Sequence, residues 1–334
     1  MITARNYAAQ VEALLIRNAS ILTNQKNRKK DASVCEMIAK DIKESVHFAL
    51  PDGGHIFDDD LKGITDRQVH FPFPKITVEY FVREDQADVH ENAPIHSPRR
   101  LALIKEIRDE EGPLKDVLTT QGLSGIVPTS IFPDGKIFQI VVAHEIPGVE
   151  AWSLCPLSWL LPASWDQASD SDQKLASLVP RKSSKHLVGY PLPILPEQYI
   201  DMCKEHGASL SIQASMHNLT GEITAVLEFC EALMCSNVNA EIIQHENKKA
   251  NKKRIKKRKL PIYETKILSI EVPVKTSRWQ GYAKIEDRNN PRQHLRRGHI
   301  RRLSDGRNIW VNSCVVGSIN TGRIDKDYHI FSAA

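Results

Sequence analysis

Hydrophobic residues near the start of the chain recur at helical spacing. Val11 and Leu14 lie on one side of a helix expected over Asn6–Leu22, and a second helix is expected from about Ala32 to Phe48. The segment Gly221–Cys235 has the same period, with apolar residues at i, i+3, i+4 and i+7. These three segments predict amphipathic helices that pack against a core.

Segments in the middle of the chain change to a period of two. Apolar residues alternate over Ile76–Val82, and a second strand is expected over Lys136–Ala143 after an Asp-Gly turn. A helix is expected between them, from Arg99 to Asp109, and strand-like alternation returns over Leu260–Val274. The pattern predicts an α+β protein: a mixed helical and stranded amino-terminal portion followed by a small, β-rich carboxy-terminal module.

Charge is divided unevenly along the chain, although the net charge is only +4. From Lys248 to Arg307 there are 20 Lys and Arg against 5 Asp and Glu, whereas the first 247 residues have 23 against 34. Nine of the twelve residues from Lys248 to Lys259 are basic, and such a block repels itself too strongly to be buried. We therefore expect an acidic α+β portion over 1–247, an exposed basic tether over 248–259 and a basic module over 260–334.

A surplus of positive charge attracts polyphosphate through counterion release, with little preference for sequence. Two alternatives remain open at this level. The basic block is a solvated linker face, or it docks on the acidic part of the same chain. The division of charge nevertheless favours two tasks for the two ends, with contact to nucleic acid made by the basic one.

Other residues favour packing or solvation over chemistry. Cysteines are scattered in a chain that shows no secretory signal, which indicates reduced thiols, and Cys230 lies in an apolar helical stripe. Asp58–Asp60 lack the spacing of a calcium loop, so a solvated turn is the preferred interpretation. Trp152, Trp159 and Trp165 are expected in the core rather than on a binding surface. No apolar stretch predicts a membrane span, and we expect a cytoplasmic protein without cofactor or metal.

The run from His294 to Asn312 contains the strongest local signal. Asp305-Gly306 stands between two strand-like runs, which predicts a two-residue hairpin turn. That turn sets Arg301 opposite Trp310 and His299 opposite Asn312. One face of the hairpin would then carry guanidinium, imidazole, indole and amide groups, which contact phosphates and stack on an unpaired base. The alternative is that the arginines pair with acidic residues and the indole simply packs.

The run His294-x-Arg296-Arg297-Gly298-His299, followed by an arginine-rich strand, a turn and a strand ending Val311-Asn312, resembles the carboxy-terminal signature of phage and plasmid proteins related to the second-described type V-A anti-CRISPR. The similarity covers mainly the last third of the chain. It implies a mobile-element protein that lowers production of a CRISPR effector by acting on its messenger RNA during translation, through recognition of the nascent polypeptide. The implied partner is RNA or a ribosome with its nascent chain, in the cytoplasm of a bacterial host.

Three functions from different classes follow from these patterns. The preferred one is an RNA-binding regulator. The second is a metal-independent ribonuclease with His294 and His299 as its catalytic acid and base. The third is a DNA-binding or structural phage protein. The expected nucleic-acid-binding residues are Arg296, Arg297, His299, Arg301, Arg302, Arg307, Trp310 and Asn312 in the module and Lys252, Lys253, Arg254, Lys256, Lys257 and Arg258 in the tether.

Overall fold

The computed structural model describes residues 4–56, 71–83, 97–108, 136–146, 151–162, 190–270, 292–296, 299–311, 314–316 and 318–324. The helices in these ranges are α1 (Tyr7–Thr23), α2 (Lys29–Glu44), α5 (Pro196–His206), α6 (Ala208–Leu233) and α7 (Lys248–Lys256). The longer strands are β1 (Val46–Ala49), β2 (Lys75–Phe81), β3 (Arg99–Arg108), β4 (Lys136–Ile146), β5 (Ala151–Leu154), β6 (Leu157–Pro162), β7 (Tyr190–Pro193), β8 (Val238–Gln244) and β9 (Thr265–Ile270). The carboxy-terminal strands are β10 (Arg292–Arg296), β11 (His299–Arg302), β12 (Asn308–Val311), β13 (Cys314–Val316) and β14 (Ser318–Ile324).

Within the described ranges the main sheet has nine strands in the order β7-β6-β4-β3-β2-β1-β9-β8, with β5 paired to β4. β1 lies parallel to both β2 and β9, and the other pairs are antiparallel. Two smaller sheets, β13-β10-β14 and β11-β12, follow in the last part of the chain. The fold is therefore of the α+β class, as the sequence predicts.

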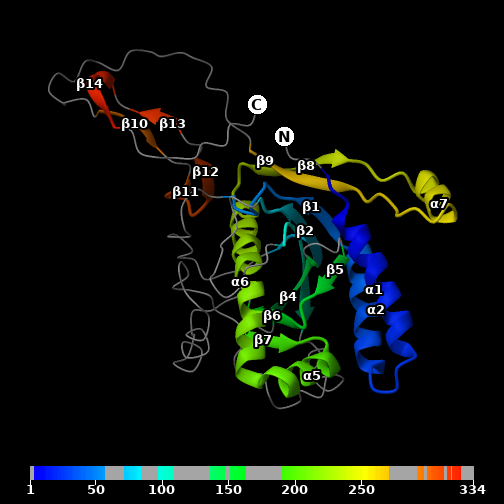
Figure 1. Ribbon diagram of the computed structural model, residues 1–334. Coiled ribbons are helices and arrows are strands. Elements are labelled where there is room, and N and C mark those ends of the chain that lie inside the picture. Colours follow the sequence, from blue (N-terminus) through cyan, green and yellow to red (C-terminus); the bar gives the residue numbers. More distant parts are fainter. Residues whose placement is uncertain are drawn as a thin grey trace.

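Helices cover both faces of the main sheet (Figure 1). Helices α1 and α2 pack on one face, where they meet Leu101 and Leu103 of β3. Helix α6 packs on the opposite face against Ala102 and Ile104 of the same strand. Because successive strand residues point to opposite faces, one strand supplies both cores. Trp152 and Trp159 are buried, which confirms the expected packing role for both, whereas Trp165 lies outside the described residues.

The helix expected over Arg99–Asp109 is wrong, because Arg99–Arg108 forms strand β3. Leu101, Ala102, Leu103 and Ile104 are all almost inaccessible to solvent, since the strand lies between two helical layers. Such a strand is a continuous apolar run without alternation, and periodicity does not separate it from a short buried helix. The second expected helix is also too long, because α2 ends at Glu44 and β1 follows.

The division expected at residues 247 and 260 does not coincide with a boundary of the main sheet. β8 lies before the basic block and β9 after it, and the two strands pair along their length from Val238–Ile270 to Gln244–Thr265. β9 also pairs with β1 in the middle of the sheet. The basic block is therefore an insertion between two neighbouring strands of the main sheet.

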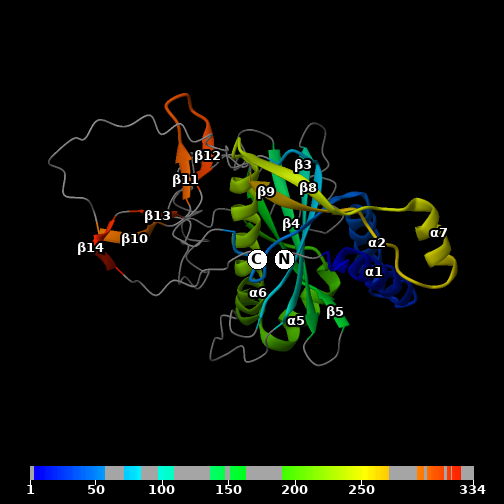
Figure 2. The same cartoon turned by 90° about the horizontal axis from the view of Figure 1, so that it is seen from above.

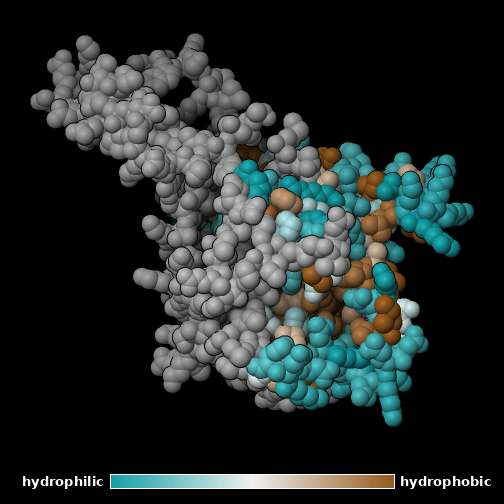
Figure 3. All heavy atoms as spheres, viewed as in Figure 1, coloured by the Kyte–Doolittle hydropathy of each residue, from teal (hydrophilic) through white to brown (hydrophobic). Residues whose placement is uncertain are grey.

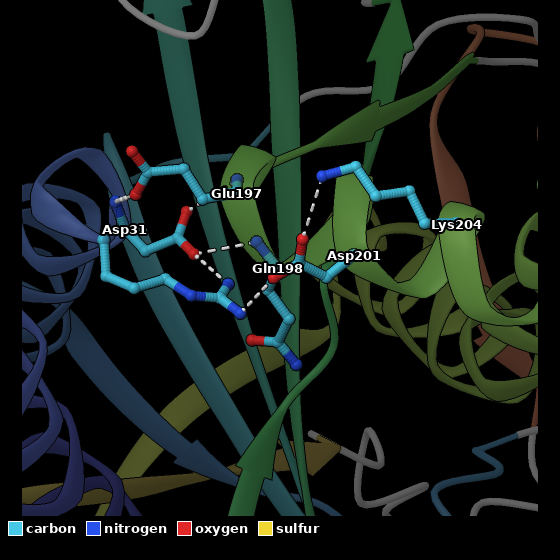
Figure 4. Close-up of polar contacts among 6 residues, drawn as sticks. Asp31, Glu197, Gln198, Asp201 and Lys204 are labelled. Carbon is cyan, nitrogen blue, oxygen red and sulfur yellow. Dashed lines mark hydrogen bonds and ion pairs between the residues drawn. The ribbon is translucent and has the colours of Figure 1, made fainter. Parts of the chain in front are cut away.

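Two helix ends are held by carboxylates from distant parts of the chain. Glu79 of β2 is 2% exposed and accepts hydrogen bonds from the backbone N–H groups at the start of α1, including Tyr7 at 2.7 Å. At the start of α5, Asp31 accepts from the N–H groups of Glu197 and Gln198, and Glu197 accepts in return from the N–H of Asp31 (Figure 4). This reciprocal capping joins α2 to α5.

No helix in the described part of the chain is both long enough and apolar enough to cross a membrane.

Candidate nucleic-acid interface

The connection between β8 and β9 carries the basic block and projects from the sheet. We call residues 245–264, which include α7, the basic arm. Its nine cations, Lys248 to Lys259, have no acidic residue among them. In Figure 3 the tip of the arm stands out from the rest of the molecule as a hydrophilic projection. None of the nine cations makes an ion pair with another residue that the structure describes.

Local interactions explain why so charged a segment forms a helix. Asn247 is the N-cap of α7, and its Oδ1 accepts a hydrogen bond from the N–H of Ala250 at 2.9 Å. At the other end the N–H of Lys259 donates to the carbonyl of Arg254, and the N–H of Arg258 donates to that of Ile255, both at 2.9 Å. These two bonds form a Schellman motif with Arg258 in the left-handed conformation at a φ of 57°.

Asn251 ties the helix to the returning chain. Its side chain is 6% exposed, its Nδ2 donates to the carbonyl of Ile262 at 2.8 Å, and its Oδ1 accepts from the N–H of Ile262 at 2.9 Å. Arg254 adds a bond from its Nε to the carbonyl of Leu260 at 2.8 Å. A nine-residue helix is marginal by itself in water, so these bonds are what hold α7 in place.

The base of the arm is anchored on α1 and β1. Asn6 donates from Nδ2 to the carbonyl of Pro261 at 2.8 Å, and the hydroxyl of Tyr263 donates to the carboxylate of Glu12. The ring of Tyr263 stacks on His47 with centroids 4.7 Å apart. Burial, followed by the hydrogen bond to Glu12, raises the pKa of Tyr263, so its hydroxyl stays protonated as the donor. The arm therefore begins from a fixed point on the body.

The expected tether residues fall into two groups. Lys252, Lys253, Lys256, Lys257 and Arg258 are exposed, as a phosphate-binding role requires. Arg254 is half-buried and turned toward the returning chain, so its contribution is structural as well as electrostatic. Sequence reasoning did not identify Asn247 and Asn251; an asparagine directly before a charged run was the available signal for a helix start at Asn247.

The expected hairpin forms from β11 and β12, but its register is one residue from the expected one. Arg301 lies opposite Ile309, and Ile300 lies opposite Trp310. The reason is the loop: Leu303 donates its N–H to the carbonyl of Arg307 at 2.8 Å, which leaves three residues in the turn with Gly306 at a φ of 85°. A shift of one residue exchanges faces, so Arg301 and Trp310 do not share a face.

The hairpin docks on the turn after α6. The N–H of Ser236 donates to the carbonyl of Asn308 at 2.9 Å. The side chain of Asn237 accepts from the N–H of Trp310 at 2.7 Å and donates to its carbonyl at 2.9 Å. Trp310 is half-buried. The amide of Asn237 thus replaces a strand partner for β12 and fixes the hairpin on the body.

The hairpin carries fewer cations than the basic arm, and some of its charge is neutralised. Arg301 and Arg302 are exposed. Arg307 forms an ion pair with Asp305 across the turn, at 2.7 Å. Arg296 lies on β10 and His299 begins β11, whereas Arg297 and Asn312 lie outside the described residues. Asp58–Asp60 also lie outside the described residues.

The two basic elements lie beyond opposite ends of β8. Figures 1 and 2 both show the hairpin beside one end of α6 and α7 beyond the far end of β8 and β9. The hairpin contacts Asn237 just before β8, and α7 follows after β8, whose seven residues span roughly 23 Å. The arm and the hairpin therefore do not form one continuous surface.

His294 and His299, the proposed catalytic pair, belong to different small sheets. His294 lies on β10 opposite Val316 of β13, and His299 lies on β11 opposite Val311 of β12. The catalytic roles of these two residues stay a prediction.

A second group of ionisable residues lies under α6. Arg100 of β3 forms an ion pair with Glu222 of α6, which is 2% exposed. One turn and a half further, Glu228 accepts from the N–H of Ile56 at 2.6 Å. Burial, and then the charge of Glu228, raises the pKa of Glu231 to about 7. These bonds hold α6 and the loop before β2 against the sheet. No metal-binding group of three or more His, Cys, Asp or Glu occurs among the described residues.

Comparison of the chain with protein-family models, with curated proteins and with solved structures found no match.

Proposed function

We propose that the protein is an RNA-binding accessory protein that engages RNA, or a translating ribonucleoprotein, through the basic arm. The observation that carries this proposal is an ordered projection with nine cations and no ion pair to any described residue. An arm that docked on the acidic part of its own chain would show such pairs. Cations held away from the body remain available to phosphates, and release of condensed counterions drives their binding.

The resemblance of the run His294–His299 to the anti-CRISPR-related phage and plasmid proteins extends the proposal. On that basis the protein belongs to a mobile element, acts in the cytoplasm of a bacterial host and lowers production of a host or defence target. The acidic portion, which holds most of the main sheet, would then recognise the target, and the basic arm would hold the assembly on RNA.

Binding of a labelled messenger RNA to the purified full-length chain tests the arm. Neutralising Lys252, Lys253 and Lys256 to glutamine removes three phosphate contacts and should weaken binding on the order of 100-fold at physiological salt. A matched control changes Lys26, Lys29 and Lys30, which are exposed at the other end of the chain, to glutamine. Equal loss in both variants, or in neither, contradicts the proposal.

The length of the RNA, followed in the same samples, tests the ribonuclease alternative. Cleavage by the purified protein that His294→Ala/His299→Ala abolishes would make the protein a nuclease. Loss of the RNA only in a translating extract would favour a regulator that recruits a host nuclease.

A further inference from the structure

Lysines on α7 form two neighbouring rows. Lys248, Lys252 and Lys256 follow one another at intervals of four, and so do Lys249 and Lys253. At about 100° per residue all five fall within an arc of about 140°. Asn251 and Arg254 occupy the opposite side and face the returning chain. The five lysines therefore point outward together in two rows. Successive Cβ atoms within each row lie about 5–6 Å apart.

This arrangement forms despite repulsion among its cations. Like charges four residues apart destabilise a helix, and α7 has three such lysine pairs. Arg258 adds a cation at the position that ends the helix in the left-handed region, where glycine is the favoured residue. The bonds of Asn247 and Asn251 counteract this cost. Binding of a polyanion would relieve it.

The arm has no exposed Phe, Tyr or Trp ring on which unpaired bases could stack. Residues 245–262 contain no Phe, Tyr or Trp. Tyr263, the next residue, is 8% exposed and stacked on His47. Proteins that hold single strands stack the bases on aromatic rings, and lysine acts on phosphate as a point charge. The surface of α7 is therefore suited to phosphates in a fixed spatial pattern, without selection of sequence.

We infer that α7 recognises an A-form RNA double helix by shape, with its two lysine rows on the two phosphate rows that border the narrow major groove. This inference rests on the proposed function and names the class of RNA. In A-form RNA the major groove is too narrow for side chains to read, so the phosphates on its two sides are the accessible pattern. The major groove of B-form DNA is wide enough to admit a whole helix, so the two phosphate rows that border it lie too far apart for two adjacent lysine rows.

Titration of the full-length chain with a 20-base-pair RNA duplex, an unstructured 20-nucleotide RNA and a DNA duplex tests this inference over a series of salt concentrations. Five lysine contacts predict a slope of log K against log salt of about −4.5 on the RNA duplex. The RNA duplex should bind at least about 10-fold more tightly than the single strand or the DNA duplex, and a scrambled duplex sequence should change the affinity less than about 2-fold. Lys252→Gln/Lys253→Gln should reduce the slope by about 2, and Lys29→Gln/Lys30→Gln should leave it unchanged.

Asn251→Ala separates shape from charge, because it keeps all nine cations and removes the bonds to Ile262. The substitution should lower the affinity for the RNA duplex by about 10-fold. It should leave the affinity for the single-stranded RNA within about 2-fold of that of the unchanged protein. Three outcomes would overturn the inference while remaining compatible with RNA binding by the arm. They are equal affinity for the duplex and the single strand, equal affinity for the RNA and DNA duplexes, and no effect of Asn251→Ala on duplex binding. Binding of neither RNA, or binding insensitive to the lysine changes, would overturn the proposed function itself.

Discussion

At the scale of the residue, burial of His47 makes stability depend on pH. His47 lies on β1 in the middle of the sheet and is 5% exposed. Burial lowers the pKa of its imidazole from 6.5 to about 4, so the ring is neutral in the folded protein at neutral pH. In the described part of the chain its Nδ1 has no hydrogen-bond partner. Such a group stabilises the fold only while it remains unprotonated.

The sign of the effect follows from the two pKa values. Between pH 6.5 and 4 the unfolded chain binds more protons than the folded one, so the free energy of unfolding falls as the pH falls through this range. The loss attributable to His47 should approach about 3 kcal/mol at pH 4. Urea unfolding at a series of pH values measures it. His47→Phe should remove this part of the slope while His245→Gln, at an exposed position, should not; an unchanged slope in His47→Phe would refute the assignment.

At the scale of the element, the structure depends on side chains that cap helices far away in sequence. Asp31 at the start of α2 and Glu197 at the start of α5 satisfy each other's backbone N–H groups, and Figure 4 shows these bonds together with the ion pair of Asp201 and Lys204. Asp31 is 1% exposed, whereas Asp201 and Lys204 are exposed. The buried bonds should therefore matter far more than the surface pair.

Asp31→Ala should lower the free energy of unfolding by about 2–3 kcal/mol, because the N–H groups of Glu197 and Gln198 lose their partner at a buried site. Lys204→Ala should change it by less than about 1 kcal/mol. Denaturant midpoints of the two variants give the comparison. Similar costs for both substitutions would show that the reciprocal cap contributes no more than a surface ion pair.

At the scale of the whole molecule, the basic arm and the body make separate contributions. The two hydrophobic cores include no residue between Asn247 and Lys259, while the pairing of β8 with β9 continues on the body side of the arm. Connections between antiparallel neighbours tolerate changes in length at low thermodynamic cost. Residues 247–259 of the arm can therefore be removed without removing the sheet that carries them.

Replacement of residues 247–259 by a flexible linker of about six glycine and serine residues should leave the thermal midpoint within about 4 °C and abolish RNA binding. Calorimetry measures the thermal midpoint, and RNA titration of the same sample measures the affinity. A lysine-rich linker of equal length provides the control for charge without helix. A large drop in the midpoint would mean that α7 contributes to the body, and retained RNA binding by the glycine and serine variant would place the interface elsewhere.

The sequence by itself determined the α+β class, helix α1, the second half of helix α6, the alternating strands β2 and β4, and the concentration of charge at Lys248–Lys259, because each depends on local periodicity or composition. Only the tertiary structure decided that Arg99–Arg108 is a strand, because burial on both faces removes its alternation. It likewise decided the hairpin register, which depends on one residue of loop length, and the ordered arm, which depends on Asn251 meeting Ile262 eleven residues away. These features are set by contacts between segments, and no local pattern encodes them.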